Sequence, residues 1–127
     1  MNTKLRKAIE DRDVWCWVCG LPNGYNFAVH HRKLRKHGGQ DEAANLIAVH
    51  HKCHNLGTGS IHLAPAWSYE RGYLVHSWDE PGDVPILRPD GSWVLLDNER
   101  KMTDVRTTHD LDGELGQRPG DPVSGLW

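Results

Sequence analysis

The pattern of apolar and polar residues in the first half of the chain predicts a helix, a pair of strands and a second helix. Residues 3–12 are mostly polar but carry apolar side chains at helical spacing, which predicts a short amphipathic helix. Residues 25–32 and 46–49 are predicted to be strands, and the segment between them contains a Gly38-Gly39 turn. The second helix is expected to begin near His51 and to end around Gly57 or Gly59. The apolar face of the first helix consists of Leu5, Ala8 and Ile9.

The second half of the chain predicts a short helix followed by a β-hairpin. Pro65 suits the first turn of a helix and Gly72 suits its C-terminal cap, so a helix is expected over residues 65–71. Residues 84–88 and 92–96 resemble strands, and the Pro89-Asp90-Gly91 sequence between them is typical of a turn. We expect this hairpin, at about residues 84–97, to complete the core rather than to contact a substrate.

The length of 127 residues supports one small α+β domain with a modest core, and a metal ion commonly supplements cores of this size. We expect this domain to span residues 1–109. Residues 110–127 are rich in glycine, proline and acidic side chains, which predicts an irregular or mobile tail. The chain contains six tryptophans. Their expected role is packing in and around the core, and stacking on an unpaired base is the alternative.

The cysteines suggest a structural zinc site. There are three cysteines, so a tetrahedral site made of side chains needs a fourth ligand of another type. Cys16 and Cys19 are separated by two residues, and His50 and Cys53 repeat that spacing, which together supply three thiolates and one imidazole to Zn²⁺. The alternative is that Cys16 and Cys19 are small buried apolar residues. A disulfide is disfavoured because residues 1–12 are polar and contain no secretory signal, and we therefore expect a cytoplasmic protein.

Four further polar residues follow the order of a known nuclease motif: His30, His31, Asn45 and His54. In this order and spacing, with the Gly-Gly turn between them, they resemble the HNH endonuclease family. The similarity covers residues 14–62 and is closest to small HNH proteins encoded by phages. It implies a ββα-metal, treble-clef-like core and a location in a bacterial or phage-infected host cell. It also implies an enzyme that hydrolyses DNA phosphodiester bonds, by nicking or by double-strand cleavage.

The resemblance also implies a role for each motif residue. His31 corresponds to the general base that activates water, and an imidazole of ordinary pKa can take up a proton at neutral pH. His30 and His54 correspond to ligands of a catalytic divalent ion, which is Mg²⁺, Mn²⁺, Ni²⁺ or Zn²⁺. Asn45 corresponds to a residue that holds His31 by a hydrogen bond. Because neighbouring strand residues point to opposite faces, either a bulge or the end of the strand is needed to redirect one of the two histidines.

Three other histidines near the motif allow more than one interpretation. The family usually has cysteine at the position of His50, so this imidazole replaces one thiolate of the zinc site. His50 and His54 are also four residues apart, which on a helix would suit a pair of catalytic ligands. We favour His50 as a zinc ligand because it completes a tetrahedral set. His51 is expected to be a solvated helix residue, with a phosphate contact as the alternative. His62 is close enough to the motif to contact phosphate or metal, but a single histidine in a loop is usually just exposed, so His62 is left outside the site.

Charge is distributed unevenly along the chain. The formal net charge is −2, but residues 1–62 carry +4 and residues 63–127 carry −6. A basic cluster follows the expected base directly, where cations could hold phosphates on both sides of a cut. An ordinary solvated loop is the alternative interpretation. The predicted DNA-binding residues are Arg32, Lys33, Arg35 and Lys36.

A second class of function competes with the enzyme. A zinc-stabilised DNA-binding module, or a phage packaging or assembly module, could keep the fold without catalysing a reaction. The presence of all four motif residues favours the nuclease. The resemblance to phage proteins also implies phage terminase or other packaging proteins as partners, in addition to DNA. The chain contains no apolar run long enough to span a membrane, so no membrane partner is expected.

Overall fold

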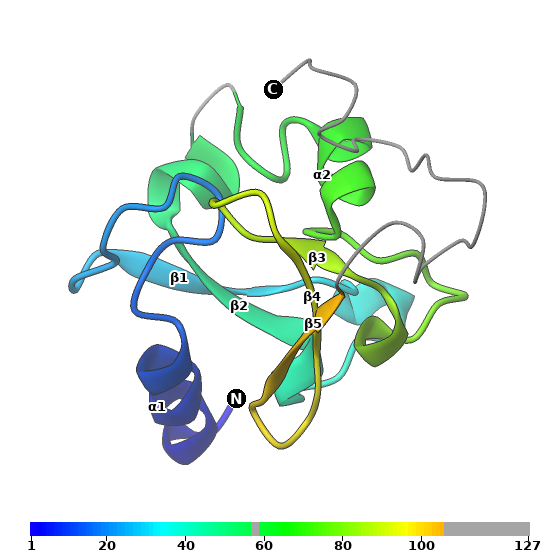
Figure 1. Cartoon of the computed structure of the whole chain (residues 1–127), viewed down its shortest axis with the longest axis horizontal. Helices are drawn as coiled ribbons and strands as arrows, with labels where there is room; N and C mark the ends of the chain where they lie inside the picture. Colours follow the sequence, from blue (N-terminus) through cyan, green and yellow to red (C-terminus); the bar gives the residue numbers. More distant parts are fainter. Residues whose placement is uncertain (57–58, 106–127) are drawn as a thin grey trace.

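The computed structural model describes residues 1–56 and 59–105, and it contains both helices and strands, as the predicted α+β class requires. The predicted tail at residues 110–127 lies outside the described residues. Single turns of 3-10 helix occur at Arg35–His37, Ala43–Asn45 and Pro81–Asp83. The main elements in chain order are α1 (Thr3–Arg12), β1 (Phe27–His31), β2 (Leu46–His50), the π-helix η3 (Lys52–Leu56), α2 (Pro65–Arg71), β3 (Ile86–Leu87), β4 (Trp93–Leu96) and β5 (Met102–Val105) (Figure 1).

Strands β1 and β2 form an antiparallel pair whose register is continuous from one end to the other. His30 lies opposite Ile47 and His31 lies opposite Leu46, with one partner for each residue and therefore no bulge. Because side chains alternate along a strand, His30 lies on the same face as Ile47, and His31 lies on the other face with Leu46. His31 is also the last residue of β1. Of the two expected ways to redirect one histidine, the structure therefore has the strand end, at His31, and not a bulge.

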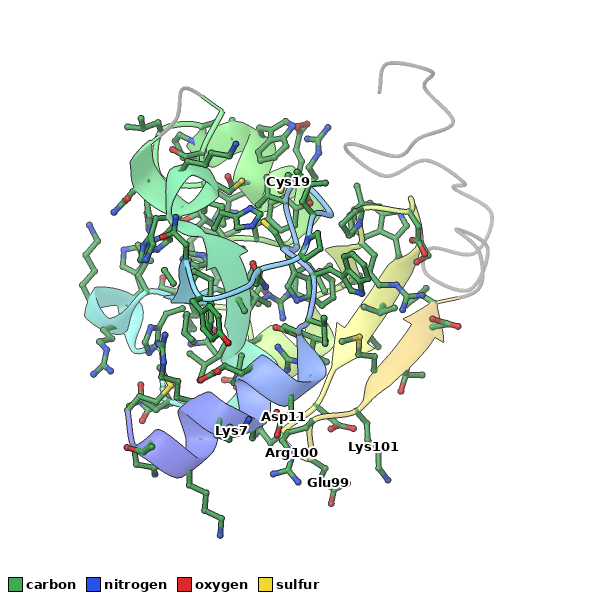
Figure 2. All side chains as sticks on the ribbon, turned by 90° about the vertical axis from the view of Figure 1, so that its left-hand side faces the viewer. Lys7, Asp11, Cys19, Glu99, Arg100 and Lys101 are labelled. Atoms are coloured by element: carbon green, nitrogen blue, oxygen red, sulfur yellow. The ribbon has the colours of Figure 1, made fainter. Side chains whose placement is uncertain are left out.

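Helix α1 covers one face of this pair (Figure 1). Ile9 is fully buried in a small cluster with Phe27, Leu46 and Ala48, so the predicted apolar face of the helix does reach the core. The end of α1 is fixed by polar contacts: the Arg12 guanidinium donates to the Ala43 carbonyl over 2.8 Å. The polar face of α1 points outward, where Lys7 and Asp11 form an ion pair of 3.1 Å (Figure 2).

The opposite face of β2 contributes to the larger core. Ile47 and Val49 pack there with residues of β3 and β4, with the segment around Cys16, and with Tyr73. Strands β3, β4 and β5 form an antiparallel sheet in that order. The predicted hairpin is therefore present and belongs to the core, as expected. Strand β5 was not predicted, because its sequence Met102-Thr-Asp-Val105 is short and half polar, and only pairing with β4 defines it.

Helix α2 begins and ends where the sequence predicted. Pro65 is in its first turn, and Gly72 follows its end with φ of 82°, a conformation that favours glycine. A Cβ at Gly72 would also lie 2.1 Å from the carbonyl oxygen of Pro85. Glycine is thus required here both by the backbone conformation and by the lack of space for a side chain. Without a side chain at this position, the end of α2 can approach β3. Within the described part of the chain, no helix is long and apolar enough to cross a membrane.

Candidate functional site

Three cysteines and one histidine converge beside the start of η3. One ligand atom from each residue lies within 4.8 Å of all the others, which is compact enough to surround one ion. The Sγ atom of Cys19 and the Nδ1 atom of His50 are 3.2 Å apart. Figure 2 shows Cys19 in the upper part of the molecule, on the side away from Lys7 and Asp11 of α1. The four members are Cys16, Cys19, His50 and Cys53, which are the residues predicted from the two spacings.

The surroundings of His50 fix which nitrogen it offers to this cluster. Its Nε2 atom lies 2.9 Å from the carbonyl oxygen of Pro22, so Nε2 carries the proton and donates it. The lone pair is therefore on Nδ1, the atom that faces Cys19. A backbone carbonyl behind a histidine in this way is a common arrangement around metal ligands. The backbone N–H of His50 also points at the Cys16 Sγ atom over 3.4 Å.

The pKa values of two of the thiols differ in direction, for identifiable reasons. Burial would raise the pKa of Cys16, but the backbone N–H groups of Cys19, His50 and Val18 outweigh it and hold that pKa below its ordinary value. Burial, together with the nearby Cys16 and Cys19 thiols, raises the pKa of Cys53 to about 12. Ionisation of Cys53 is thus opposed by burial and by the neighbouring sulfur atoms unless a cation lies among them. A Zn²⁺ ion removes this repulsion, so the donor set fits zinc.

A second cluster consists of three histidines: His30, His54 and His62. One ring nitrogen from each lies within 4.8 Å of the others. The Nε2 atoms of His54 and His62 are 3.0 Å apart. The ring of His30 meets those of His54 and His62 edge to face, with centroid distances of 5.0 and 5.1 Å. The predicted pair His30 and His54 is therefore brought together, and a third imidazole joins it.

His30 is oriented for a metal ion. Its Nε2 atom lies 2.7 Å from the carbonyl oxygen of Tyr73 and so carries the proton. The lone pair is then on Nδ1, which is buried and makes no hydrogen bond to any described residue. A buried acceptor without a partner is costly, and a cation bound between the three rings would supply the missing interaction. The three histidines therefore fit a divalent ion, because an ion would bind the His30 Nδ1 atom that has no other partner.

All three imidazoles of the trio favour the neutral form, which is the form that binds metal. Burial, together with the charges of His54 and His62, lowers the pKa of His30 to about 3. Burial and the charges of His62, His51 and His31 lower the pKa of His54 to about 4. The pKa of His62 is lowered by burial and by Lys36. At neutral pH, binding of a metal ion therefore does not have to displace protons from His30 or His54.

Sequence reasoning left His62 outside the site because a single histidine in a loop has no periodic signal. The structure shows how the chain brings it there. The N–H of Ile61 donates to the Cys53 carbonyl over 2.8 Å, and the N–H of His62 donates to the His54 carbonyl over 3.1 Å. The chain after η3 thus returns to the start of η3, and His62 lies beside His54, eight positions earlier.

His31 is half-buried and forms its side-chain contact with Asp41. The His31 Nε2 atom lies 2.7 Å from a carboxylate oxygen of Asp41. This hydrogen bond is the main reason that the pKa of Asp41 lies below its ordinary value, with Arg35 also contributing. The structure therefore differs from the expectation that Asn45 holds His31 directly. Asp41 is a residue that the sequence analysis missed, although it lies in the turn between the two motif strands.

Asn45 acts on the loop that carries His31 and Asp41. Its Oδ1 atom accepts a hydrogen bond from the Lys33 N–H over 2.6 Å, and its Nδ2 atom donates to the Lys33 carbonyl over 3.1 Å. The same amide group donates to the Gln40 carbonyl over 3.0 Å. Asn45 is itself 1% exposed. It thus fixes the chain two residues after His31 and one residue before Asp41, so its effect on His31 is indirect.

Gly39 allows this loop to close. A Cβ at that position would lie 1.7 Å from the carbonyl oxygen of Lys33, which no side chain could avoid. The Gly-Gly pair that the sequence analysis interpreted as a turn therefore has a steric role. It lets the chain pass close to the residues that follow His31.

The prediction that Arg32 binds DNA is corrected by the structure. Arg32 is fully buried, and its guanidinium donates to carbonyl oxygens on several segments. Burial lowers the pKa of Arg32 to about 9, so the group is still charged at neutral pH. A cation with all its donors directed inward cannot contact a phosphate. Its acceptors are the carbonyl oxygens of Gly72, Ala44, Pro81 and Val84.

The other three basic residues of the cluster lie nearer the surface. Lys33 is half-buried, and its Nζ atom donates to the Asp79 carbonyl over 3.1 Å. Arg35 is exposed and pairs with Asp41 over 2.9 Å. Lys36 is exposed, and its charge is close enough to His62 to lower the pKa of that imidazole. His51 is also exposed.

Comparison with known proteins agrees with this arrangement. Residues 16–58 match the family model described as HNH endonuclease. The match includes the zinc-type cluster, both histidines of β1, Asn45 and His54, and it confirms the resemblance inferred from the sequence. Neither the curated proteins nor the solved structures gave a significant match.

Proposed function

Since residues 16–58 match the HNH endonuclease family model, we propose that this protein is a metal-dependent endonuclease that hydrolyses phosphodiester bonds of DNA. The proposal is supported by two separate sets of metal-binding side chains. It is also supported by His31, which follows the trio residue His30 directly in the chain and is held by a carboxylate.

The catalytic ion is proposed to bind to His30, His54 and His62. When bound there, a divalent ion supplies a positive charge that stabilises the scissile phosphate and the departing oxygen. Three neutral imidazoles suit Mn²⁺, Ni²⁺ and Zn²⁺ better than Mg²⁺, which prefers oxygen ligands. The protein holds the ion site in place, because the His30 ring is fixed by its hydrogen bond to the Tyr73 carbonyl and by its burial in the core.

His31 is proposed to be the general base. Its Nε2 atom contacts the Asp41 carboxylate, so Nε2 carries the proton and Nδ1 has the free lone pair. Nδ1 can then accept a proton from the attacking water molecule, and the Asp41 carboxylate stabilises the imidazolium that results. His31 is near enough to the trio that its charge lowers the pKa of His54. A base that acts on water at the phosphate has to lie near the ion, and His31 is adjacent in the chain to the proposed ion ligand His30.

The zinc ion is proposed to be structural. Cys16 is fully buried and Cys53 is 8% exposed, both within the larger core cluster. Four protein ligands leave no open position for a substrate, which is the usual difference between structural and catalytic zinc. The ion would join the segment before β1 to the start of η3, and so fix the helix that carries His54.

DNA is proposed to be held partly by Lys36 and Lys33. Lys36 is exposed and its charge lowers the pKa of His62, and Lys33 lies two residues after the end of β1. Cations at these positions would contact phosphates near the cut. Arg35 is bonded to Asp41 and would contribute to the position of that carboxylate as well as to binding.

The orphaned Nδ1 of His30 in the histidine trio is the observation that carries the proposal, and a supercoiled-plasmid assay tests it. Chelator-treated protein is restored with Mg²⁺, Mn²⁺, Ni²⁺ or Zn²⁺, and His31→Ala protein is run in parallel. The proposal predicts metal-dependent nicking or linearisation that is lost in His31→Ala. Absence of cutting with every metal, in protein that retains zinc, would support the silent DNA-binding module instead.

A further inference from the structure

Three aromatic rings form a parallel stack at the surface. The rings of Tyr69 and His76 have a centroid distance of 4.0 Å and an interplanar angle of 7°. Those of His76 and Trp78 have a centroid distance of 4.5 Å and an angle of 5°. Trp78, at the outer end, is 76% exposed. Since one face of its ring lies on His76, the other face is available to a ligand.

The chain that carries His76 and Trp78 is fixed to the end of β1. The Tyr73 carbonyl contacts the His30 Nε2 atom over 2.7 Å. The N–H of Val75 donates to the Arg32 carbonyl over 2.9 Å. Residues 73–75 are therefore hydrogen-bonded to the end of β1, which carries both motif histidines. His76 is the next residue in the chain.

Tyr69, at the inner end of the stack, lies on a helix that is hydrogen-bonded close to His62. It lies on α2, one residue after Ser68, whose hydroxyl donates to the Ile61 carbonyl over 3.0 Å. Ile61 directly precedes His62 and is fully buried. The stack is thus built from two segments. Helix α2, which carries Tyr69, is hydrogen-bonded to Ile61 next to His62, and the segment that leads to His76 is hydrogen-bonded to His30.

A cation lies next to the stack as well. The Nζ atom of Lys33 donates to the Asp79 carbonyl over 3.1 Å, and Asp79 follows Trp78 directly. The N–H of Asp79 donates to the His76 carbonyl over 3.0 Å, so a tight turn presents the tryptophan. An exposed aromatic face with a cation nearby matches the two parts of a nucleotide, its base and its phosphate.

We propose that the Tyr69–His76–Trp78 stack is a nucleobase-binding platform, on which an unpaired base of the substrate stacks against Trp78. This rests on the proposed function, because it names the class of DNA that reaches the histidine trio. Bases within a duplex are already stacked on their neighbours, so the platform favours DNA with a single-stranded or unpaired region. Stacking is tolerant of sequence, since every base has an aromatic face.

The test measures binding without cleavage. His31→Ala protein is titrated into a fluorescent single-stranded oligonucleotide and into the duplex of the same sequence, and anisotropy gives each Kd. Adding Trp78→Ala is expected to raise the single-strand Kd by roughly tenfold, since stacking contributes about 1–3 kcal/mol per base. The duplex Kd should change little. Trp78→Phe, which keeps an aromatic face, should retain most of the affinity.

Trp15→Ala is the matched control, because Trp15 is also exposed, at 57%, but lies outside the stack. An unchanged single-strand Kd in Trp78→Ala would overturn the platform. Equal losses for single strand and duplex, or an equal loss in Trp15→Ala, would also overturn it. The nuclease is tested separately: if the wild type never cuts a plasmid but single-strand binding depends on Trp78, the platform stands and the proposed activity falls.

Discussion

The Nε2 atom of His31 and a carboxylate oxygen of Asp41 lie 2.7 Å apart, although the two residues are ten positions apart in the chain. The Asn45 side chain holds together the two ends of the loop between these residues, because it is hydrogen-bonded to the backbone of Lys33 at one end and of Gln40 at the other. The asparagine thus fixes a loop, and the loop provides the carboxylate. This division of roles leads to the first prediction.

Asp41→Ala is expected to slow plasmid cleavage by about 10- to 100-fold, as loss of a supporting residue behind a functional histidine commonly does. Asp41→Asn should be less damaging, because the amide oxygen can still accept the hydrogen bond without a charge. The melting temperature should change little, since Asp41 is exposed. Glu42→Gln is the control, a neighbouring carboxylate that pairs with Asn98 instead. Wild-type cleavage by Asp41→Ala would contradict the role of this carboxylate.

His62→Ala is expected to weaken the binding of Mn²⁺ or Ni²⁺ at the trio. The metal concentration needed for half-maximal cleavage should rise by about tenfold or more, since loss of a direct ligand should cost at least as much as loss of its supporting group. Isothermal titration calorimetry of the same metals should show the same change without DNA. His51→Ala, an exposed histidine on the same part of the chain, is the control. If both variants need equal metal, His62 is not a ligand.

Cys16→Ser and Cys53→Ser are expected to lower the melting temperature by roughly 10 °C or more. Structural zinc contributes several kcal/mol, and each kcal/mol shifts the melting temperature of a small domain by about 4–8 °C. His31→Ala should melt almost as the wild type does. Thermal denaturation followed by circular dichroism, with zinc content measured on each sample, checks this. Equal damage from all three substitutions would argue against separate structural and catalytic sites.

Arg32→Met is expected to destabilise the fold by several kcal/mol rather than to weaken DNA binding selectively. Its loss leaves buried carbonyl groups without donors, each costing roughly 1–3 kcal/mol. Lys36→Ala should do the reverse: the melting temperature stays constant, DNA affinity falls, and the salt dependence of binding decreases by about one phosphate contact. A well-folded Arg32→Met protein with wild-type melting would show that this buried network is dispensable.

Stability should fall as the pH decreases from about 6.5 towards 4. An unfolded histidine has a pKa near 6.5, whereas the folded pKa of His30 is about 3 and that of His54 is about 4. The unfolded chain therefore takes up protons first, so the stability contributed by these groups is fully present above pH 6.5 and is lost below it. His30→Asn should lessen the decrease in melting temperature between pH 6.5 and 4.5. Zinc loss at low pH affects both proteins alike, and identical slopes would contradict the buried neutral state of His30.

The sequence predicted the parts of the structure that depend on local patterns. Residues 65–71 carry proline at one end and glycine at the other, and α2 has these bounds. The Cys16-x-x-Cys19 and His50-x-x-Cys53 spacings predicted which four side chains meet, because spacing on a knuckle and on a helix start fixes the direction of the ligands.

Features that depend on tertiary contacts were not predictable in this way. Arg32 looked like its basic neighbours, and only the packing of three other segments around it makes it a core residue. His62 became part of the trio because the chain returns to the start of η3, where the His62 N–H donates to the His54 carbonyl. Asp41 was one of several acidic residues in a loop, and its contact with His31 depends on the position that Asn45 gives the chain. Strand β5 has too little apolar character to be recognised without β4.

The most direct test of the two-site account is to measure zinc content, folding and cleavage in the same sample after mild chelation. We predict that the treated protein retains one zinc ion per chain and its circular dichroism spectrum, that it does not cut supercoiled plasmid, and that added Mn²⁺ or Ni²⁺ restores cutting in the wild type but not in His54→Ala. Cutting that persists without added metal, or that returns equally in His54→Ala, would contradict a catalytic ion at the histidine trio.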